Sequence, residues 1–596
     1  MPAEVLTAAF QIKIDGVQLQ DVYYDALHVA TVDMSIHMPD MATIELRLAS
    51  LDDLDGANLA AVGKELELLA LANAEFDSDG TPTSLFKGPI VAVDVEFLPT
   101  ANARLILRAY DKSFGLHMGT KYRSFVNQKD SDMVSKIASE SGVSVTTDAT
   151  TEVHKHVLQA NVSNWDFILE RARLNGYVAV GRAGKLQFVK PETLAGTAIN
   201  LDYGSTLQDL TITQTMVGQV NEVAATGWDQ SKKQVITGKS TAPEWSTTSA
   251  TITAPSAFLG KVGWQNTAAK VTVPALPSSA AATTAAKAAR DVGSSQQFHA
   301  YGRAYGNPAI VAGGRITLTG IGTRFSGEYT VTRVRHVLSM KEPYLTEFWI
   351  GGMSPSTLAS SLLPPAGARS GTHAAANGLV PAIVTNIEDK DGGYGRVKVK
   401  YPWLDDAVES NWARVVSPGA GATRGLMILP EVNDEVIVGF LHGDFNNPYV
   451  LGGVWNHSDA PPTAQNAAAT GGKTEVRQLK TRAGHMITLK DKSGEEQIEI
   501  KDKEGNFLLI DTKNKLIHLN SLGDIKIDAV GAITVNSKSM AVATKMDFKV
   551  DAKTDLKLAG LMLTAEGKTK ASLKAPLIDV TGTGPVTIKG TPVGIN

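Results

Sequence analysis

Between residues 474 and 596 the chain repeats a short segment in which apolar residues occupy alternate positions. Gly, Asp, Asn, Lys and Ser separate these segments, and the spacing settles at about eight residues. The segments begin at Ile487, Ile498, Leu508, Ile517, Ile525, Ile533, Ala541, Phe548 and Leu556, and later at Ile578 and Val586. A period of two with turn-forming residues in between predicts strand, turn and strand, repeated along the region.

One such unit is too short to enclose a core of its own. Eight residues extend roughly 26 Å, which gives one short strand and a turn, whereas a single-chain solenoid needs several sides in each layer. Burying two aliphatic residues per strand contributes roughly 3–6 kcal/mol at most. A lone ribbon would lose most of that and would expose its strand edges. The pattern therefore predicts self-association into a rigid rod, roughly 55–60 Å long if the strands stack about 4.7 Å apart.

Apolar residues at alternate positions of these segments are the expected core of the rod. They are Ile517, Leu519, Ile525, Ile527, Ile533, Val535, Leu556 and Leu558.

Two segments rich in Ser, Ala, Pro and Gly divide the chain and are predicted to be linkers, at residues 354–378 and 459–473. A chain of 596 residues is also too long for a single core. Between the linkers, residues 379–458 contain short strand-like runs separated by Gly-rich turns. Arg396–Tyr401, residues 426–429 and Glu435–Phe440 are among the expected strands. This spacing predicts a small β-barrel.

The barrel sequence is specific enough to indicate a family. GRVKVKYPWL, followed by WARVVSPGAGATRGLMILPEVNDEVIVGFLHGDFNNPYVLGGVWN, closely resembles the OB-fold domain of phage baseplate and tail-spike proteins and of the VgrG proteins of type VI secretion. Upstream, LFKG at residues 85–88 and LRAYDKSFGLHMGTKYRSFVNQKDSDMVSKIASESGV resemble the phage late-control gene D family, which forms hub barrels. The resemblance covers nearly the whole chain.

Local signals in the N-terminal half agree with that resemblance. Residues 163–166 (SNWD) predict a capped helix with Trp165, Ile168, Leu169 and Ala172 on one face and Gly176 at its end. GYVAVGRAGKLQFVKP resembles a hairpin of that family, and GNPAIVAGGRITLTGIGTRFSGEYTVTRVRHVLS with YLTEFWIGG indicates a second barrel. The Ala-rich residues 280–293 predict a closely packed helix.

The resemblance implies a mainly β fold with minor α content. Its parts are a first hub barrel with a helical portion (1–205), a second hub barrel (206–353), an OB-fold collar (379–458) and an intertwined trimeric β-helical needle (474–596). It implies a VgrG-like central spike and hub of a bacterial contractile injection system. Inner-tube proteins, baseplate proteins and a PAAR-like tip protein are the implied partners, with toxin as possible cargo and the target membrane contacted mechanically. The implied tip contact comprises Thr591, Pro592, Val593, Gly594, Ile595 and Asn596.

Composition adds few constraints. The net charge is only −4, so nothing draws the chain toward nucleic acid or an anionic membrane, and no nucleic-acid partner is expected. Without cysteine, disulfides and thiolate metal sites are excluded. The start, MPAEVLTAAFQIKIDG, has no basic n-region or long apolar core, and no run of 18 apolar residues occurs. We expect neither a signal peptide nor a membrane helix. We expect the protein to assemble in the bacterial cytoplasm and to act outside the cell or at a target envelope.

No motif predicts catalysis or a cofactor. HExxH, GxSxG and paired-Cys motifs are absent, and GAGATRG at residues 419–425 lacks the lysine and the following helix of a phosphate loop. The linker before the needle is too short for the lysozyme that some phage spikes carry, and no toxin domain follows the needle. The expectation is therefore no enzyme. Two alternatives stay open: an OB-fold ligand-binding module and a spike-associated cell-wall hydrolase. The few aromatic residues of the barrel, such as Trp403 and Trp412, are expected to pack rather than to stack on bases.

Two candidate metal sites are weak, and no metal is expected. His154 and His156 lie on one face of a predicted strand, where an exposed strand or an inter-domain contact is the favoured explanation. The acidic runs at 52–56 and 77–80 lack the later ligands of a calcium loop, so turns are favoured. Some phage spikes bind iron through a His-x-His near the tip, whereas this chain has no histidine after His518.

Overall fold

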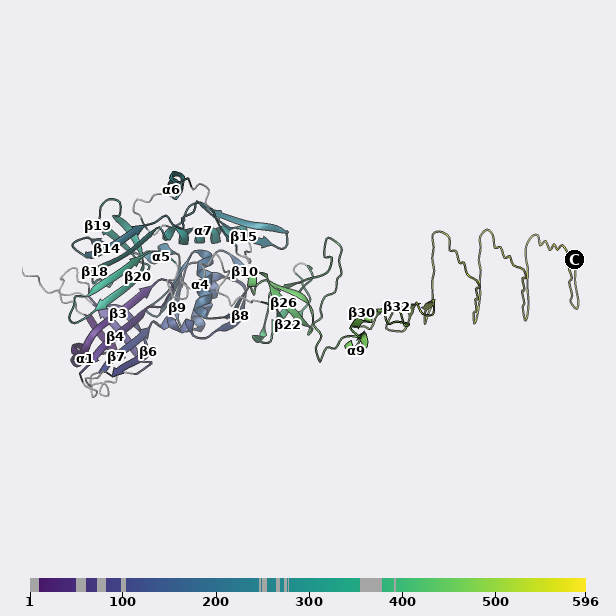
Figure 1. The fold of residues 1–596 in the computed structure, drawn as a ribbon, viewed down its shortest axis with the longest axis horizontal. Helices are drawn as coiled ribbons and strands as arrows, with labels where there is room; N and C mark the ends of the chain where they lie inside the picture. The colour runs from purple at the N-terminus through teal and green to yellow at the C-terminus, as the bar shows by residue number, and fades with distance from the viewer. Residues whose placement is uncertain are drawn as a thin grey trace, which may run out of the picture. The chain divides into compact units, whose positions relative to one another are not determined.

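The computed structural model describes residues 10–49, 61–71, 82–97, 103–245, 248, 255–263, 268–272, 276, 278–353, 378–390 and 393–595. The chain forms two units, Met1–Gln465 (unit 1) and Asn466–Asn596 (unit 2), each described by itself below (Figure 1). The prediction of a mainly β protein with minor α content is confirmed. The finer domain boundaries within unit 1 stay predictions.

A 13-stranded sheet forms the largest part of unit 1. Its main path runs through β14 (Leu207–Gln214), β18 (Phe298–Tyr305), β21 (Leu345–Ile350), β20 (Gly327–Leu338), β3 (Leu27–Ser35), β4 (Met41–Leu48), β7 (Ala103–Tyr110), β6 (Thr83–Phe97), β5 (Glu65–Ala70), β1 (Phe10–Ile14) and β2 (Val17–Gln18). Two further strands, β13 (Ile199–Asp202) and β19 (Arg315–Thr319), pair beside β20. The strands of both predicted hub regions thus belong to one sheet, joined where β20 pairs with β3.

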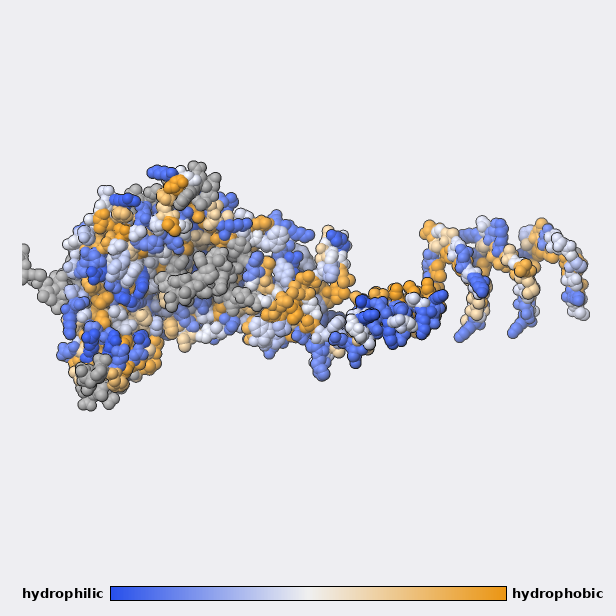
Figure 2. Space-filling view, in the orientation of Figure 1, coloured by the Kyte–Doolittle hydropathy of each residue, from blue (hydrophilic) through white to orange (hydrophobic). Residues whose placement is uncertain are grey.

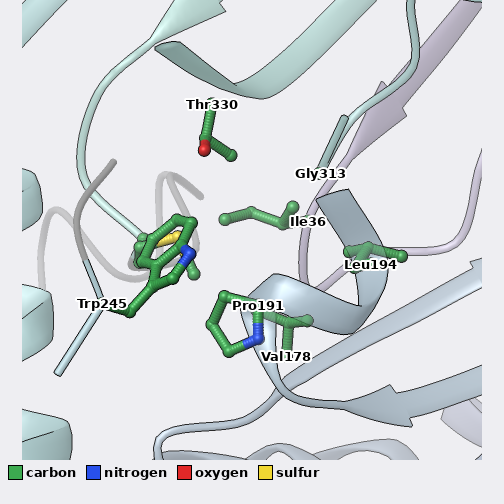
Figure 3. A pocket seen from close by; sticks show the side chains of 8 residues that line it. Ile36, Val178, Pro191, Leu194, Trp245, Gly313 and Thr330 are labelled. Atoms are coloured by element: carbon green, nitrogen blue, oxygen red, sulfur yellow. The ribbon is translucent and has the colours of Figure 1, made fainter. Parts of the chain in front are cut away.

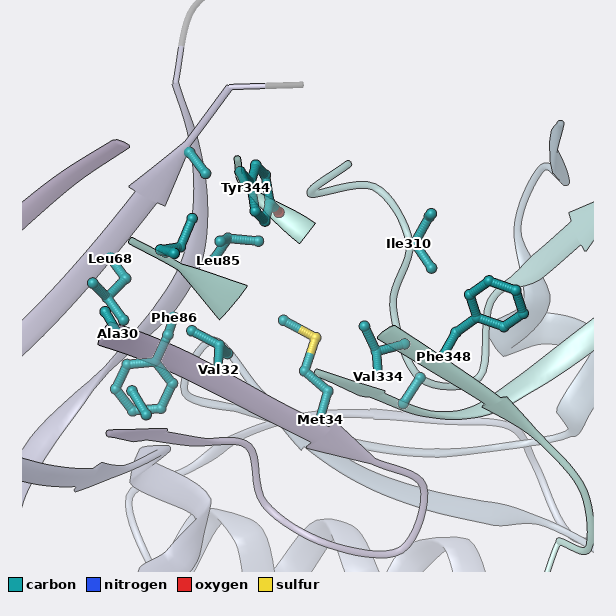
Figure 4. Close-up of a cluster of buried hydrophobic side chains, with 14 of the residues drawn as sticks. Ala30, Val32, Met34, Leu68, Leu85, Phe86, Ile310, Val334, Tyr344 and Phe348 are labelled. Atoms are coloured by element: carbon teal, nitrogen blue, oxygen red, sulfur yellow. The ribbon is translucent and has the colours of Figure 1, made fainter. Parts of the chain in front are cut away.

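Alternation of apolar and polar residues along these strands separates a core face from a polar face. The core face carries Val32, Met34, Val334 and Phe348, all fully buried (Figure 4). Burying such side chains is the main source of stability for a sheet of this kind.

On the polar face, one row of directly opposed residues alternates in charge across five neighbouring strands. Asp209, Arg303, Glu347, Arg335 and Asp33 follow one another from β14 to β3. The guanidinium of Arg303 lies 2.6 Å from Asp209, and Arg335 Nε donates to Asp33 Oδ1 at 2.8 Å. Because opposite charges facing each other stabilise a strand pair and like charges destabilise it, this row favours the observed register.

Helices and two smaller sheets pack around a second core. The elements are η1 (Lys112–His117), β8 (Lys121–Lys129), α3 (Asp130–Glu140), β9 (Ser144–Thr147), β10 (Val153–Val162), α4 (Asn164–Asn175), β11 (Val178–Arg182) and β12 (Lys185–Val189). The short helices α1 (Asp21–Ala26) and α5 (Pro191–Ala195) contribute Tyr23 and Leu194 to the core of the large sheet instead. The predicted capped helix is confirmed as α4: Ser163 Oγ accepts from the Asp166 amide at 3.0 Å, and Gly176 ends the helix with φ 70°. The hairpin predicted after it is confirmed as β11 and β12.

The Ala-rich helix is confirmed as α7 (Ser279–Ser295), with Ala282, Ala285 and Ala286 buried. It packs on the sheet of β15 (Glu222–Asp229), β16 (Gln234–Ser240) and β17 (Ala268–Thr272), while α6 (Pro255–Lys261) lies between β16 and β17 in sequence. The approach to β16 is so close that a Cβ at Gly238 would lie 2.1 Å from the Thr283 nitrogen. Small residues on both elements are therefore required.

The OB region is a closed barrel of five strands. The ring runs β22 (Val380–Asn386), β26 (Glu435–Phe440), β27 (Pro448–Gly453), β25 (Ala413–Val415) and β23 (Arg396–Tyr401), and the β22–β23 pairing closes it; β24 (Asp405–Glu409) adds to β23, and η2 (Leu441–Gly443) follows β26. Two of the three predicted strands are confirmed, as β23 and β26. The strand predicted at residues 426–429 is wrong: the segment belongs to the irregular connection between β25 and β26. Its apolar composition predicted a strand, but no strand in the described ranges pairs with it.

Unit 2 begins with α9 (Gln465–Ala468, starting at the boundary), β28 (Ala469–Thr470) and β29 (Lys473–Thr474). It continues as a five-stranded antiparallel sheet of β30 (Val476–Lys480), β31 (Met486–Lys490), β32 (Gln497–Lys501), β33 (Phe507–Asp511) and β34 (Leu516–Asn520). Within residues 521–595 the structure assigns no strand. Since each eight-residue unit needs neighbours to pair with, the needle strands predicted there stay a prediction.

Candidate functional site

One side of the β30–β34 sheet is an uninterrupted apolar surface, here called the needle face. Two rows of directly opposed side chains form it: Leu479, Ile487, Ile500, Leu508 and Leu519 in one, and Leu489, Ile498, Ile510 and Ile517 in the other. Figure 2 shows hydrophobic residues gathered along one side of the segment that Figure 1 labels β30 and β32.

No described residue of unit 2 covers the needle face. Ile517 is 72% exposed and Ile500 50% exposed, although both belong to rows that a soluble protein normally buries. The opposite side of the sheet is mixed, because Gln478, Thr488 and Glu499 share it with Met486, Phe507 and Leu509. The needle face is therefore the more apolar of the two sides.

The residues predicted for the needle core are all exposed in the single chain. Ile517 and Leu519 lie on β34, while Ile525, Ile527, Ile533, Val535, Leu556 and Leu558 lie in the irregular part beyond it. Their role as a shared core stays a prediction. The same holds for the predicted tip contact: Thr591, Pro592, Val593, Gly594 and Ile595 are exposed, and Asn596 lies outside the described residues.

His154 and His156, the two histidines considered as metal ligands, both lie on β10 but contact different residues. His154 Nε2 lies 3.1 Å from Asp130 Oδ2, and this carboxylate also accepts from Asn175 Nδ2 at 2.8 Å. Burial lowers the pKa of His156 to about 4, against the effect of a hydrogen bond with the Glu409 backbone in the OB barrel. His156 thus belongs to a contact between hub and barrel, which is one of the two explanations favoured from sequence. Among the described residues no cluster of three or more His, Cys, Asp or Glu is placed to hold a metal ion. The acidic runs at 52–56 and 77–80 lie outside the described residues.

The contact between hub and barrel is mainly apolar. Leu158 and Ala160 of β10 pack with Phe445, and Asn446 Oδ1 accepts from the Leu158 amide at 2.7 Å. No local pattern in the sequence indicates this contact, because residues nearly 300 positions apart form it.

The basic and aromatic residues of the barrel form an already neutralised cluster. Arg396 lies over the rings of Tyr394 and Trp412, at 5.1 and 5.9 Å, but it makes a bidentate ion pair with Asp389. Lys398 lies over Trp412 at 5.5 Å, and its ammonium is bonded to a carboxylate of β24 at 3.0 Å. Cations with such partners are poorly suited to bind phosphate.

The other barrel features weighed from sequence have ordinary structural roles. Trp403 is half exposed and donates through Nε1 to the Pro381 carbonyl at 3.0 Å, so it packs on the outside of the barrel. Residues 419–425 form a connecting loop with a bridge between Gly421 and Arg424, as favoured from sequence.

A small cavity lies in the hub, lined by Ile36, Val178, Pro191, Leu194, Trp245, Gly313, Thr330 and Met353 (Figure 3). Its volume of about 10 Å³ corresponds to at most one water molecule. Trp245 Nε1 has no hydrogen-bond partner among the described residues and is the polar group that such a water would satisfy. The cavity has neither the size nor the titratable groups of a catalytic pocket.

Two buried histidines make the hub sensitive to acid. His336 bonds to the Tyr344 hydroxyl at 2.8 Å, and burial lowers its pKa to about 3, while burial lowers the pKa of His37 to about 4. The unfolded chain binds these protons near the ordinary pKa of 6.5. The stability contributed by the neutral rings is therefore fully present above about pH 6.5 and is lost as the pH falls toward the folded-state values.

We expect the low pKa of His336 alone to lower the free energy of unfolding of the hub by on the order of 5 kcal/mol as the pH falls from about 6.5 to 3. Denaturant unfolding followed by tryptophan fluorescence at a series of pH values measures this loss. A matched variant, His457→Asn at an exposed position, should show the same pH dependence as the parent chain. An unfolding midpoint that stays constant from about pH 7 to pH 4 would contradict the assignment.

A family model described as the Alg8 N-terminal domain matches residues 5–340, more than half of the chain. The chain belongs to this family. The Alg8 N-terminal domain region contains most of the 13-stranded sheet and helices α3, α4 and α7. The description of this family names no activity, and the family is not the late-control gene D family that the sequence was said to resemble. A second model, described as the type VI secretion system/phage-baseplate injector OB domain, matches residues 380–455, which contain the closed barrel.

Curated relatives agree with the second model. The type VI secretion system spike protein VgrG1a of Pseudomonas aeruginosa is 38% identical over 114 residues, which cover 18% of this chain and 18% of that protein. The spike protein VgrG3 of Vibrio cholerae is 36% identical over 112 residues, 18% of this chain and 11% of that protein. The chain thus spans less than a fifth of the length of these curated relatives.

The similarity in fold covers more of the chain than the similarity in sequence does. A chain of the Francisella PdpA-VgrG complex, half-lidded, covers 86% of this chain and 88% of its own length, with a TM-score of 0.51 at 9% identity. At this identity the likeness concerns the fold alone. Together with the relatives, it confirms the predicted resemblance to VgrG-like spike proteins. None of the helices in the described ranges is both long and apolar enough to cross a bilayer.

Proposed function

We propose that the chain is the central spike and hub of a bacterial contractile injection system and that it works as a homotrimer. The observation that carries this proposal is the exposed needle face, in which two cross-strand rows of aliphatic residues lack a cover. The eight-residue pattern then continues toward Ile588 with its apolar residues equally exposed. Three intertwined copies would bury these rows, and a rod stiffened in this way is suited to transmit force.

The partners of the proposed spike follow from its two ends. We infer that inner-tube and baseplate proteins contact the hub, and that a PAAR-like protein contacts residues 591–596 at the needle end. Toxin cargo would travel on the tip or in the tube, and the target membrane would be contacted mechanically. The particle would assemble in the cytoplasm of the producing bacterium and act outside it or at a target envelope.

The proposed work is mechanical, with its energy supplied by an outer sheath, and the chain itself is not proposed to be an enzyme. The relatives named as spike proteins support this assignment, as do Arg396 and Lys398 of the barrel, which already have acidic partners. A ligand-binding OB module and a spike-associated hydrolase are the two alternatives, and the following measurement tests the first of them.

The absolute mass of the full chain and of residues 466–596, measured by light scattering before and after dilution, tests the proposal. We expect three chains per particle in both, with the fragment resisting SDS because its strands are intertwined. Residues 1–465 serve as the comparison and should associate more weakly, since they lack the needle face. Single chains in both samples would overturn the spike proposal and favour the OB barrel as a binding module.

A further inference from the structure

Charge is distributed unevenly along the chain, although its net charge is only −4. Residues 1–465, which form unit 1, contain 37 Lys and Arg against 46 Asp and Glu, a net charge of −9. Residues 466–596, which form unit 2, contain 20 Lys and Arg against 15 Asp and Glu, a net charge of +5. An asymmetry of this kind indicates that the basic part meets an anionic partner.

The positive charge of residues 521–596 lies in their later part. Residues 521–555 contain five lysines and five acidic residues, so they are neutral. Residues 556–596 contain five lysines but only two acidic residues, Glu566 and Asp579. Three copies would therefore bring together 15 lysines and six acidic residues in this part. Ion pairs between copies cannot neutralise such an excess.

Three of the later lysines, Lys568, Lys570 and Lys574, lie close together in sequence and are here called the lysine cluster. All three are exposed. Lys557 differs from them, because its ammonium lies 3.6 Å from the Asp555 carboxylate. In the described ranges no acidic side chain lies within ion-pair distance of the lysine cluster. The charges of the cluster are therefore available for an external partner.

The pattern around the lysine cluster directs its ammonium groups away from the proposed needle core. The chain bends at Lys568, and a bend also occurs at Lys553, two repeats earlier, so Lys568 occupies a corner of the repeat. Lys570 and Lys574 are an even number of positions apart, which places them on the same side of an extended chain. The residues that alternate with them are small or apolar: Ala571, Leu573 and Ala575. When these face the core that three copies share, the lysines face water.

The composition of the needle favours a lipid surface over a nucleic acid or a protein. Residues 521–596 contain no Arg, Trp or Tyr. Contacts with bases and with protein partners depend largely on those residues, which bind bidentately or stack. A lysine presents a point charge on a flexible stem, so it can follow phosphate groups in any arrangement. Each lysine near an anionic bilayer strengthens binding about five-fold.

We propose that the lysine cluster binds the anionic lipid headgroups of the target envelope when the needle meets it. This proposal rests on the spike proposed above and gives its membrane contact, described so far as mechanical, a chemical preference. The net charge of the whole chain predicts no such attraction. Because the acidic excess lies in unit 1, the basic character of the needle is hidden in the whole-chain value.

Vesicle co-sedimentation of full-length particles tests the proposal. Two kinds of vesicle are used, phosphatidylcholine alone and phosphatidylcholine mixed with phosphatidylglycerol. We expect the parent chain to bind the mixed vesicles and to be released as the salt concentration rises, since salt screens exposed charges. The triple variant Lys568→Gln, Lys570→Gln and Lys574→Gln should bind them on the order of 100-fold more weakly. Equal binding of the parent chain to both kinds of vesicle would overturn the proposal.

A matched variant removes the same charge from the neutral part of the needle. Lys526→Gln, Lys538→Gln and Lys545→Gln also changes three lysines but leaves the lysine cluster intact. We expect it to bind the mixed vesicles within about five-fold of the parent chain, because charges act over only about 10 Å at about 0.1 M salt. If both triple variants lose binding alike, the attraction comes from the overall charge of the needle, and the assignment to the cluster is wrong. A parent chain that binds duplex DNA but not the mixed vesicles would also overturn the proposal.

The experiment distinguishes a failure of this proposal from a failure of the spike proposal. Light scattering checks that each variant keeps the mass of the parent particle, so that weaker binding reflects the lost charges. A parent particle of three chains that fails to bind the mixed vesicles would overturn the lipid proposal and leave the spike standing. Single chains that still bind through the lysine cluster would overturn the homotrimer and leave the lipid contact standing.

Discussion

Replacing Ile500 by Asp is expected to convert the proposed trimer of unit 2 into single chains. Ile500 lies at the middle of one row of the needle face, between Ile487 and Leu508. Losing its burial in three copies removes roughly 5–9 kcal/mol per trimer, and the introduced carboxylates would have to enter an apolar contact without partners. A loss of this size raises the dissociation constant by a factor of roughly 10³ or more. Light scattering of the fragment 466–596 over a dilution series measures the change.

The same strand provides a matched control. Lys501→Asp introduces the same residue one position further along, where the side chain points to the opposite side of β32. We expect this variant to keep the mass of the parent fragment. If both variants dissociate equally, the needle face is not the surface that joins the copies. If neither dissociates, its apolar rows contribute little to assembly.

Features of the hub that depend on neighbouring residues in sequence could be predicted well. Helix α4 follows from the Ser163 cap, its apolar stripe and Gly176, all within 14 residues. Helix α7 follows from its composition, and the hairpin of β11 and β12 from alternation around a short turn. In each case the interactions that determine the structure lie within one turn or one strand, so the local sequence pattern is enough to predict them.

Pairings between distant strands could not be predicted in the same way. The union of the hub strands into one sheet depends on β20 pairing with β3, about 300 residues away, and the charge row that includes Asp33 and Arg335 exists only in that register. Residues 426–429 illustrate the converse error. They have the composition of a strand, yet a strand needs a partner to pair with, and none of the described strands pairs with them.

The spacing of the apolar residues in the needle face could be predicted from the sequence, but the pairing of its strands could not. Alternation identified residues such as Ile517 and Leu519 as apolar positions of the needle, and their exposure agrees with the argument that one chain cannot cover them. The antiparallel register that aligns them into two rows across β30–β34 came from the structure.

A deletion of eight residues in the needle should be tolerated, whereas a deletion of seven at the same place should not. Removing residues 548–555 joins Asp547 to Leu556, so that Leu556 and Leu558 take the positions of Phe548 and Val550 and every later apolar residue keeps its side. The chain loses one layer, worth roughly 3–6 kcal/mol per copy as an upper bound, and the rod shortens by about 4.7 Å. We expect a trimer with the parent's number of chains and a slightly lower thermal midpoint.

Removing residues 548–554 instead leaves Asp555 next to Asp547 and moves Leu556 to an outward position. Since side chains alternate between the two sides of a strand, a slip of one residue turns every following apolar side chain from the core toward water. The needle beyond Asp547 should then fail to assemble, and the fragment should become sensitive to SDS and to protease downstream of the deletion. Mass and protease resistance, measured side by side on the two deletion variants, distinguish a layered, intertwined needle from a tail that associates nonspecifically. A tail held together by nonspecific apolar contacts would respond alike to the loss of seven or eight residues, and that result would contradict the repeat on which the proposed spike depends.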